Sequence, residues 1–81
     1  MNEERKRLFE LLSSILNVSY EDVNEEMSPD NTPSWDSFNG LMLAAELEKT
    51  FDVKFEMEEI ITTRNVGDIV RNLKGYGIEI E

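Results

Sequence analysis

The stretch from Trp35 to Phe51 constrains the fold most strongly, because its apolar residues fall on two separate stripes of one helix. At about 100° per residue, the first stripe contains Gly40, Leu43, Ala44, Leu47 and Phe51. The second stripe lies roughly opposite and contains Phe38, Leu41, Met42 and Ala45. A surface helix in a small domain needs only one apolar stripe to face the core. The pattern therefore predicts that the second stripe packs against another helix, holds a ligand or contacts a partner protein.

Two polar residues open this helix, which we expect to span residues 37–51. Asp36 is a good N-cap, because its carboxylate can accept hydrogen bonds from the unpaired N–H groups of the first turn. Ser37 follows at the mouth of the helix, beside that carboxylate. A serine in the first turn is ordinarily a local hydrogen-bonding residue, and the spacing alone favours this ordinary role over a modified serine.

Three more segments have helical spacing of apolar residues, near residues 3–16, 56–62 and 66–74. Asn2 and Asn65 are the expected N-caps of the first and last of these helices. The segment 56–62 makes fewer than two full turns and depends on packing against its neighbours. The sequence therefore predicts an all-α fold, a small four-helix bundle of three main helices plus a short third helix.

The first two helices are joined by a long loop, residues 17–35. Pro29 and Pro33 block regular helix there and restrict the residues that precede them. The whole chain, residues 1–81, is short enough for a single domain with one modest core. After the last helix, we expect residues 75–81 to fray.

The composition excludes several classes of function. The 81 residues include neither Cys nor His, and the net charge is −10. Thiol nucleophiles, common zinc ligands and Ser-His-Asp sites are therefore missing, so we expect no metal site and no self-sufficient enzyme. The negative charge disfavours nucleic acids and anionic membranes, and no apolar run reaches membrane-spanning length. We expect a cytoplasmic monomer.

The acidic residues gather in the middle of the chain. Residues 21–59 contain 12 acidic residues and only two basic ones, so this segment accounts for the whole excess of negative charge. One interpretation is simple solubilising charge. The other is a recognition surface for basic partner proteins.

Three segments carry a resemblance to a known family. They are Asp-Ser-Phe at 36–38, Glu-Leu-Glu-Lys-Thr-Phe-Asp at 46–52, and Ile-Ile-Thr-Thr-Arg-Asn-Val-Gly-Asp-Ile-Val at 60–70. Together with the amphipathic first helix, the long loop and the short length, they resemble an acyl carrier protein of the phosphopantetheine-dependent family. The signature of this family is Asp-Ser-Leu, and its serine carries 4′-phosphopantetheine.

The resemblance implies that Ser37 bears a 4′-phosphopantetheine arm derived from coenzyme A, with Asp36 as its motif partner. A helix N-terminus suits the phosphodiester, because its dipole and free N–H groups favour an anion. The thiol of the arm does the chemistry, which agrees with a chain that lacks Cys and His. The implied partners are a phosphopantetheinyl transferase and the acyl-loading and acyl-using enzymes with basic surfaces.

The resemblance also implies a surface for partners and for the acyl chain. We assign to it Phe38, Leu41, Met42, Ala45, Glu48, Met57, Ile60 and Ile61. We expect Phe38 and Met42 to be partly exposed and to dock partners, while Leu41 and Ala45 turn toward the third helix and any acyl chain. In the alternative, the third helix and the long loop cover the second stripe fully.

The sequence departs from the family pattern at three positions of the central helix. Phe38 replaces the usual Leu, and Met42 and Lys49 stand where acidic residues are common. These differences concern the identity of the partners and leave the pathway open among fatty acid, polyketide and nonribosomal peptide biosynthesis.

Two other functions agree with the residues. One is an unmodified helical adaptor of the same fold that binds a partner protein through the second stripe. The other is an acidic metal-buffering module, which lacks the ligand spacing of an EF-hand.

Overall fold

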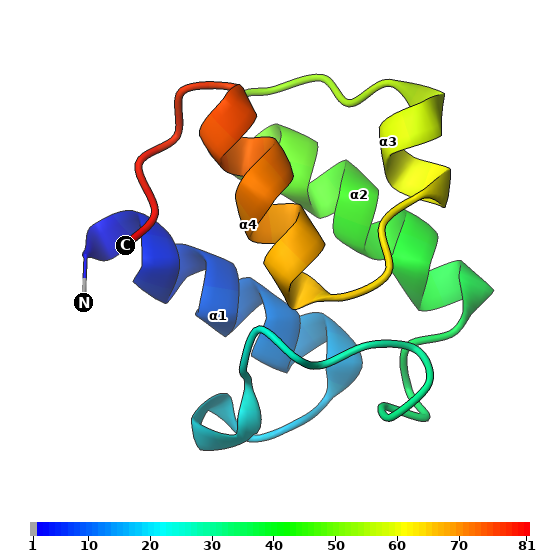
Figure 1. The fold of residues 1–81 in the computed structure, drawn as a ribbon. Coiled ribbons are helices and arrows are strands. Elements are labelled where there is room, and N and C mark those ends of the chain that lie inside the picture. Colours follow the sequence, from blue (N-terminus) through cyan, green and yellow to red (C-terminus); the bar gives the residue numbers. More distant parts are fainter. Residues whose placement is uncertain (1) are drawn as a thin grey trace.

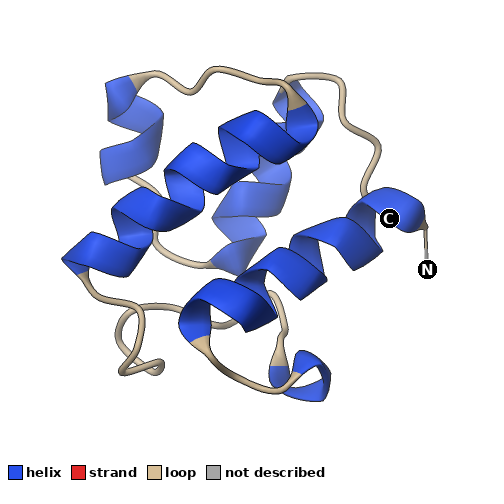
Figure 2. Ribbon diagram, turned by 180° about the vertical axis from the view of Figure 1, so that it is seen from behind, coloured by secondary structure: helices blue, strands red, loops and turns tan. Residues whose placement is uncertain are grey.

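Four α-helices make up the computed structural model, which describes residues 2–81. They are α1 (Glu3–Leu16), α2 (Ser37–Phe51), α3 (Met57–Ile61) and α4 (Val66–Gly75), with a 3₁₀ turn η1 (Tyr20–Asp22) in the long loop. Figure 1 shows α1, α2 and α4 grouped together, with the short α3 at the edge beside α2. Seen from behind in Figure 2, the described residues contain helices and loops but no strand. The predicted all-α architecture is therefore confirmed.

The ends of the helices follow from single polar residues. Each N-cap side chain accepts a hydrogen bond from the backbone N–H three residues later, with N···O distances of 2.9, 2.9 and 2.8 Å for Asn2, Asp36 and Asn65. At the other ends, Asn17 and Asp52 adopt left-handed backbone conformations with φ of 56° and 55°. Such a residue closes a helix by turning the chain away from its axis. The predicted caps are confirmed.

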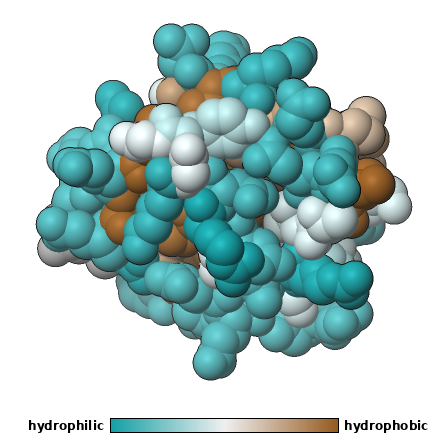
Figure 3. Space-filling view, turned by 45° about the horizontal axis from the view of Figure 1, so that its top comes forward, coloured by the Kyte–Doolittle hydropathy of each residue, from teal (hydrophilic) through white to brown (hydrophobic). Residues whose placement is uncertain are grey.

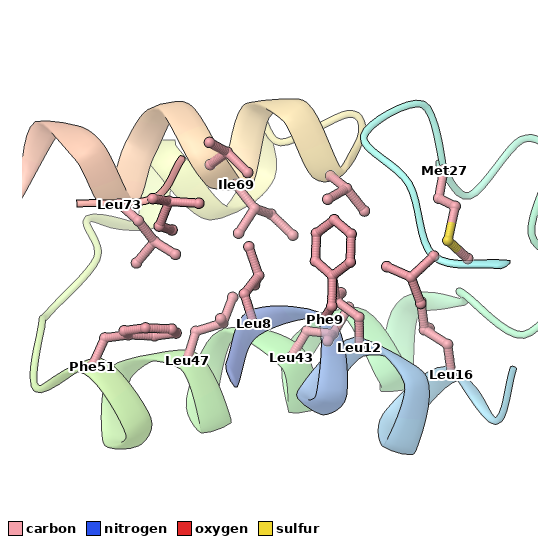
Figure 4. Packing of buried hydrophobic residues seen from close by; sticks show 14 of the residues in the cluster. Leu8, Phe9, Leu12, Leu16, Met27, Leu43, Leu47, Phe51, Ile69 and Leu73 are labelled. Carbon is pink, nitrogen blue, oxygen red and sulfur yellow. The ribbon is translucent and has the colours of Figure 1, made fainter. Parts of the chain in front are cut away.

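The core lies between α4 on one side and α1 and α2 on the other, as Figure 4 shows. Each of these helices contributes the apolar stripe that its sequence predicts. The fully buried side chains of greatest volume are Leu8, Leu12, Leu16, Leu73 and Val66. From α2, the buried residues are Leu43, Leu47 and Phe51. No helix within residues 2–81 is long and apolar enough to cross a membrane.

The long loop is attached to this core by buried side chains and by backbone hydrogen bonds. Met27 and Trp35 are buried, and Trp35 anchors the loop to α2, as expected for a large apolar side chain. The backbone N–H of Val66 donates to the Met27 carbonyl, and that of Gly67 donates to the Glu25 carbonyl, both at 2.9 Å. The loop thereby pairs donors that the first turn of α4 would otherwise leave unsatisfied.

The C-terminal segment is packed, in contrast to the expectation that residues 75–81 fray. Ile80 is only 3 % exposed and belongs to the core. Arg5 Nη1 donates to the Glu81 carbonyl at 2.7 Å, and Asn2 Nδ2 donates to the Glu79 carbonyl. These contacts hold the C-terminus beside the start of α1, as Figure 1 shows. Burial of Ile80 offsets the entropy lost on ordering the segment.

Candidate functional site

Ser37 is the first residue of α2, and its side chain is exposed. The side chain of the neighbouring N-cap, Asp36, pairs one N–H group of the first turn: its Oδ1 accepts from the backbone N–H of Asn39. Within the described residues, the backbone N–H groups of Ser37 and Phe38 donate to no protein acceptor. An accessible hydroxyl therefore lies beside two free N–H groups, in the field of a helix N-terminus that favours negative charge.

A pocket of about 690 Å³ lies between α2, α3 and α4, and Ser37 is one of the residues that line it. Pro29 and Trp35 of the loop line it together with the start of α2, and the face of α2 that carries Gly40, Ala44 and Leu47 forms one wall. Its lining comprises Pro29, Trp35, Asp36, Ser37, Gly40, Leu41, Leu43, Ala44, Leu47, Phe55, Glu59, Ile60, Ile61, Thr63, Ile69 and Asn72.

The second stripe of α2 faces solvent. Phe38 is 71 % exposed, Leu41 is 62 % exposed, Met42 is 39 % exposed, and Ala45 is exposed as well. Met57 and Ile61 of α3 add two more exposed apolar side chains. Figure 3 shows such brown apolar side chains at the surface between hydrophilic residues. The expected exposure of Phe38 and Met42 is confirmed, and α3 and the long loop do not cover the stripe. Partner docking there stays a prediction.

The residues of this stripe that line the pocket differ in part from those expected. Leu41 does line the pocket together with Ile60 and Ile61 of α3, as predicted. Ala45 does not line it, and Ala44 takes that place. The reason is the helical step of about 100°, which turns Ala45 out of the face shared by Gly40, Ala44 and Leu47.

Glu48, assigned from the sequence to the partner surface, has a structural contact. Its Oε2 accepts a hydrogen bond from the backbone N–H of Phe55 at 2.8 Å, and the side chain is half-buried. This bond ties the link after α2 back to the last turn of the helix. One of its carboxylate oxygens is therefore occupied within the protein.

Glu59 of the short helix α3 links this helix to Tyr76, the residue after α4. Its Oε1 accepts hydrogen bonds from the Tyr76 hydroxyl and, at 2.8 Å, from the backbone N–H of Glu56. These bonds stabilise the carboxylate and lower the pKa of Glu59, the Tyr76 contact being the larger cause. The same contact raises the pKa of Tyr76 to about 12. The Tyr76 ring also packs edge-to-face on Phe55, with centroids 5.6 Å apart.

Sequence reasoning missed the polar residues of the pocket wall, Glu59, Thr63 and Asn72. They come from α3, the turn after it and α4, and only the folded arrangement of these segments around the pocket brings them together. No spacing in the sequence signals this convergence. By contrast, the stripe of Gly40, Ala44 and Leu47 was visible as a face of α2. Within residues 2–81, no group of three or more Asp and Glu side chains is placed to hold a metal ion.

A family model described as "phosphopantetheine attachment site" matches residues 6–73. The chain belongs to this family. Its members carry covalently attached 4′-phosphopantetheine, which is therefore the cofactor of this carrier. The match covers most of α1, all of α2 and α3 and most of α4, and it includes Ser37.

The fold of this carrier is also that of a solved structure, described as a putative acyl carrier protein from Mycobacterium tuberculosis. The TM-score is 0.81, with 18 % sequence identity, 90 % of this chain and 97 % of that chain being covered. This likeness confirms the acyl-carrier fold predicted from the sequence. No curated protein matches the sequence in the corresponding comparison.

The surroundings of Ser37 fit an attached phosphopantetheine. The hydroxyl is accessible, the free N–H groups of the first turn suit a phosphodiester, and the pocket gives apolar surface next to this hydroxyl. When bound, the arm supplies a thiol that the chain itself lacks.

Proposed function

We propose that Ser37 is the attachment residue and that the protein carries acyl groups as thioesters on the attached arm. The observation that carries this proposal is the accessible Ser37 hydroxyl at the start of α2, among the residues that line the pocket. In the modification, the serine oxygen forms a phosphodiester with the phosphopantetheine half of coenzyme A. The bond within the pyrophosphate breaks, 3′,5′-ADP leaves, and the serine proton is released.

The protein in this proposal binds and presents its cargo and has no catalytic activity of its own. The chain contains no His and no Cys, so the usual proton-transfer and nucleophilic side chains are absent. Holding the cargo on a tether raises its effective concentration at the active site of each partner enzyme. The partners are the phosphopantetheinyl transferase and the enzymes that load or use the acyl group.

Two features support docking through α2. Phe38 and Met42 present apolar surface next to Ser37, and a methionine adapts to several partners because its side chain is flexible. The 12 acidic residues between positions 21 and 59 attract proteins with basic surfaces. An enzyme that combines an apolar groove with basic residues around it would match this face.

The experiment that tests the attachment residue incubates the apo protein with coenzyme A and a phosphopantetheinyl transferase. The wild type should gain one phosphopantetheine in an intact-mass measurement, and Ser37→Ala should gain none. Ser34→Ala is the matched control, because this serine lies only three residues earlier, in the loop before α2, and the variant should be modified as the wild type is. Modification of Ser37→Ala, or a wild type left untouched by a panel of transferases, would favour the unmodified adaptor instead.

A further inference from the structure

The side of the pocket opposite α2 is mixed, because three polar residues lie there among the apolar Phe55, Ile60, Ile61 and Ile69. Glu59, Thr63 and Asn72 all line the pocket and are half-buried. A carrier that sheltered plain hydrocarbon would gain most from an apolar wall on every side. These three side chains, called the polar wall below, therefore indicate that the cargo itself carries a polar group.

These side chains have unused capacity to accept hydrogen bonds. Both protein donors that reach Glu59 use Oε1, and within the described residues none reaches Oε2. Thr63 Oγ1 donates to the Glu59 carbonyl at 2.7 Å, and its closest side-chain donor, Asn72 Nδ2, lies 3.5 Å away, at the limit of a hydrogen bond. No protein donor in the described part of the chain reaches Asn72 Oδ1. Glu59 Oε2 and Asn72 Oδ1 are thus free acceptors, while Asn72 Nδ2, whose one protein bond is at this limit, also remains a donor.

The negative charge of Glu59 also favours a hydrogen-bond donor in the cargo. The pKa of Glu59 is lowered, mainly by the Tyr76 hydroxyl, so the side chain is ionised at neutral pH. Within the described residues, Glu59 takes part in no ion pair. A cargo with its own carboxylate would be repelled, and a methylene chain would remove water from a charged group without replacing its hydrogen bonds.

The pocket is long enough for a cargo to reach this wall from the attachment point. Its α2 side extends from Ser37 to Leu47, which is about 15 Å at 1.5 Å per residue. Figure 1 shows α4 running from the loop toward the C-terminal end of α2, so that its later residues lie toward the far part of this wall.

We infer that the cargo bears a hydrogen-bond donor, a hydroxyl or an amine, that pairs with Glu59 and Asn72 inside the pocket. This inference rests on the proposed function, because it takes the cargo to be attached at Ser37, one of the residues that line the pocket. The shared chemistry is the donor. A hydroxyl is a neutral donor, whereas a protonated amine adds an ion pair with Glu59.

In the test, a phosphopantetheinyl transferase loads the apo protein from synthetic acyl-coenzyme A analogues whose acyl chains have equal length. The melting temperature of each loaded protein is then measured. The chains are plain, keto, hydroxyl or amino, with the substituent placed at successive carbons. A donor-bearing chain should raise the melting temperature above that of the plain chain by about 4–8 °C, the shift that one net hydrogen bond gives in a domain of this size. The keto chain, which only accepts, can pair with Asn72 Nδ2 but not with Glu59, so its rise should be smaller than that of the donor-bearing chains.

Variants locate the effect. Glu59→Gln replaces the free acceptor by an amide that can also donate, so the preference should shift from the hydroxyl to the keto chain. Asn72→Leu should weaken the hydroxyl preference. Glu58→Gln is the matched control, since Glu58 is exposed on the same helix and does not line the pocket. It should leave the preferences of the wild type unchanged.

The outcomes separate the two proposals. Equal melting temperatures for all loaded chains, or the highest one for the plain chain, would overturn the donor-bearing cargo and leave the carrier function intact. Failure to load any chain onto Ser37 would overturn both. A preference that survives Glu59→Gln and Asn72→Leu would show that the polar wall is not its source.

Discussion

The hydroxyl of Tyr76 donates a hydrogen bond to Glu59 Oε1, and this bond joins the residue after α4 to the short helix α3. None of the α3 residues is fully buried, so the packing of Ile60 and this bond are among its main attachments. A helix of five residues is not stable alone. Because α3 lines the pocket, Tyr76 helps to hold a wall of the site from outside it.

Tyr76→Phe should therefore remove the bond and leave the ring contact with Phe55 in place. Hydrogen exchange measured residue by residue should become faster in α3 and stay unchanged in α1, which lies apart from this contact. Equal exchange in α3 of the variant and the wild type would show that packing alone holds the helix.

The same pair predicts a dependence of stability on pH. The pKa of Tyr76 is raised to about 12 from its usual 10.0, so its contribution to stability is present below pH 10 and is lost as the pH rises through about 12. The pKa of Glu59 is lowered from 4.5, so its contribution is present above pH 4.5 and is lost as the pH falls through the folded-state value. Melting curves of wild type and Tyr76→Phe should converge at both extremes. A constant difference across the whole range would contradict this linkage.

Two variants of Asp36 separate its role as a cap from its role toward the transferase. Asp36→Ala should cost about 0.5–2 kcal/mol of stability, because Asn39 N loses its acceptor. Asp36→Asn keeps an N-cap of similar strength and should melt close to the wild type. If the negative charge itself contacts the transferase, Asp36→Asn should be modified more slowly despite its normal stability. Equal modification rates would limit Asp36 to capping.

The two stripes of α2 should respond differently to truncation. Leu47 is 2 % exposed, so Leu47→Ala should destabilise the fold by about 2–5 kcal/mol. Met42→Ala removes a side chain that is 39 % exposed and should change stability by no more than about 0.5 kcal/mol. Transfer of cargo to or from the partner enzyme should nevertheless become slower in Met42→Ala. A variant that unfolds as readily as Leu47→Ala would make the second stripe part of the core.

Salt should stabilise the protein. Of the acidic side chains between positions 21 and 59, Glu25 alone forms an ion pair within the described residues, with Arg5 at 3.0 Å. The remaining charges repel one another, and screening weakens that repulsion. The melting temperature should fall at low ionic strength and recover with millimolar divalent cation. Melts that do not move with salt would refute the effect.

Local features of the fold were accessible from the sequence, whereas contacts between distant segments were not. The caps Asn2, Asp36 and Asn65 act on backbone groups three residues away, so their chemistry is visible in the chain. The packing of Ile80 depends on the position of α1, nearly the whole chain away, and the local alternation of isoleucine and glutamate does not reveal it.

The candidate site shows the same division. The start of α2 at Ser37 and the outward stripe of Phe38 and Met42 follow from helical periodicity. Ala44 lines the pocket in place of the expected Ala45, which shows how one helical step changes the assignment. Asn72 could not be assigned, because only the orientation of α4 brings it to the pocket.

The central claim is that Ser37 bears the arm in the working protein. The most direct measurement is peptide mapping by mass spectrometry of the protein isolated from its own source, without added transferase. We predict that the peptide containing Ser37 carries one phosphopantetheine and that the peptide containing Ser13 and Ser14, the control serines of α1, carries none. An unmodified Ser37 peptide, in cells that contain a transferase active on the apo protein, would contradict the carrier function.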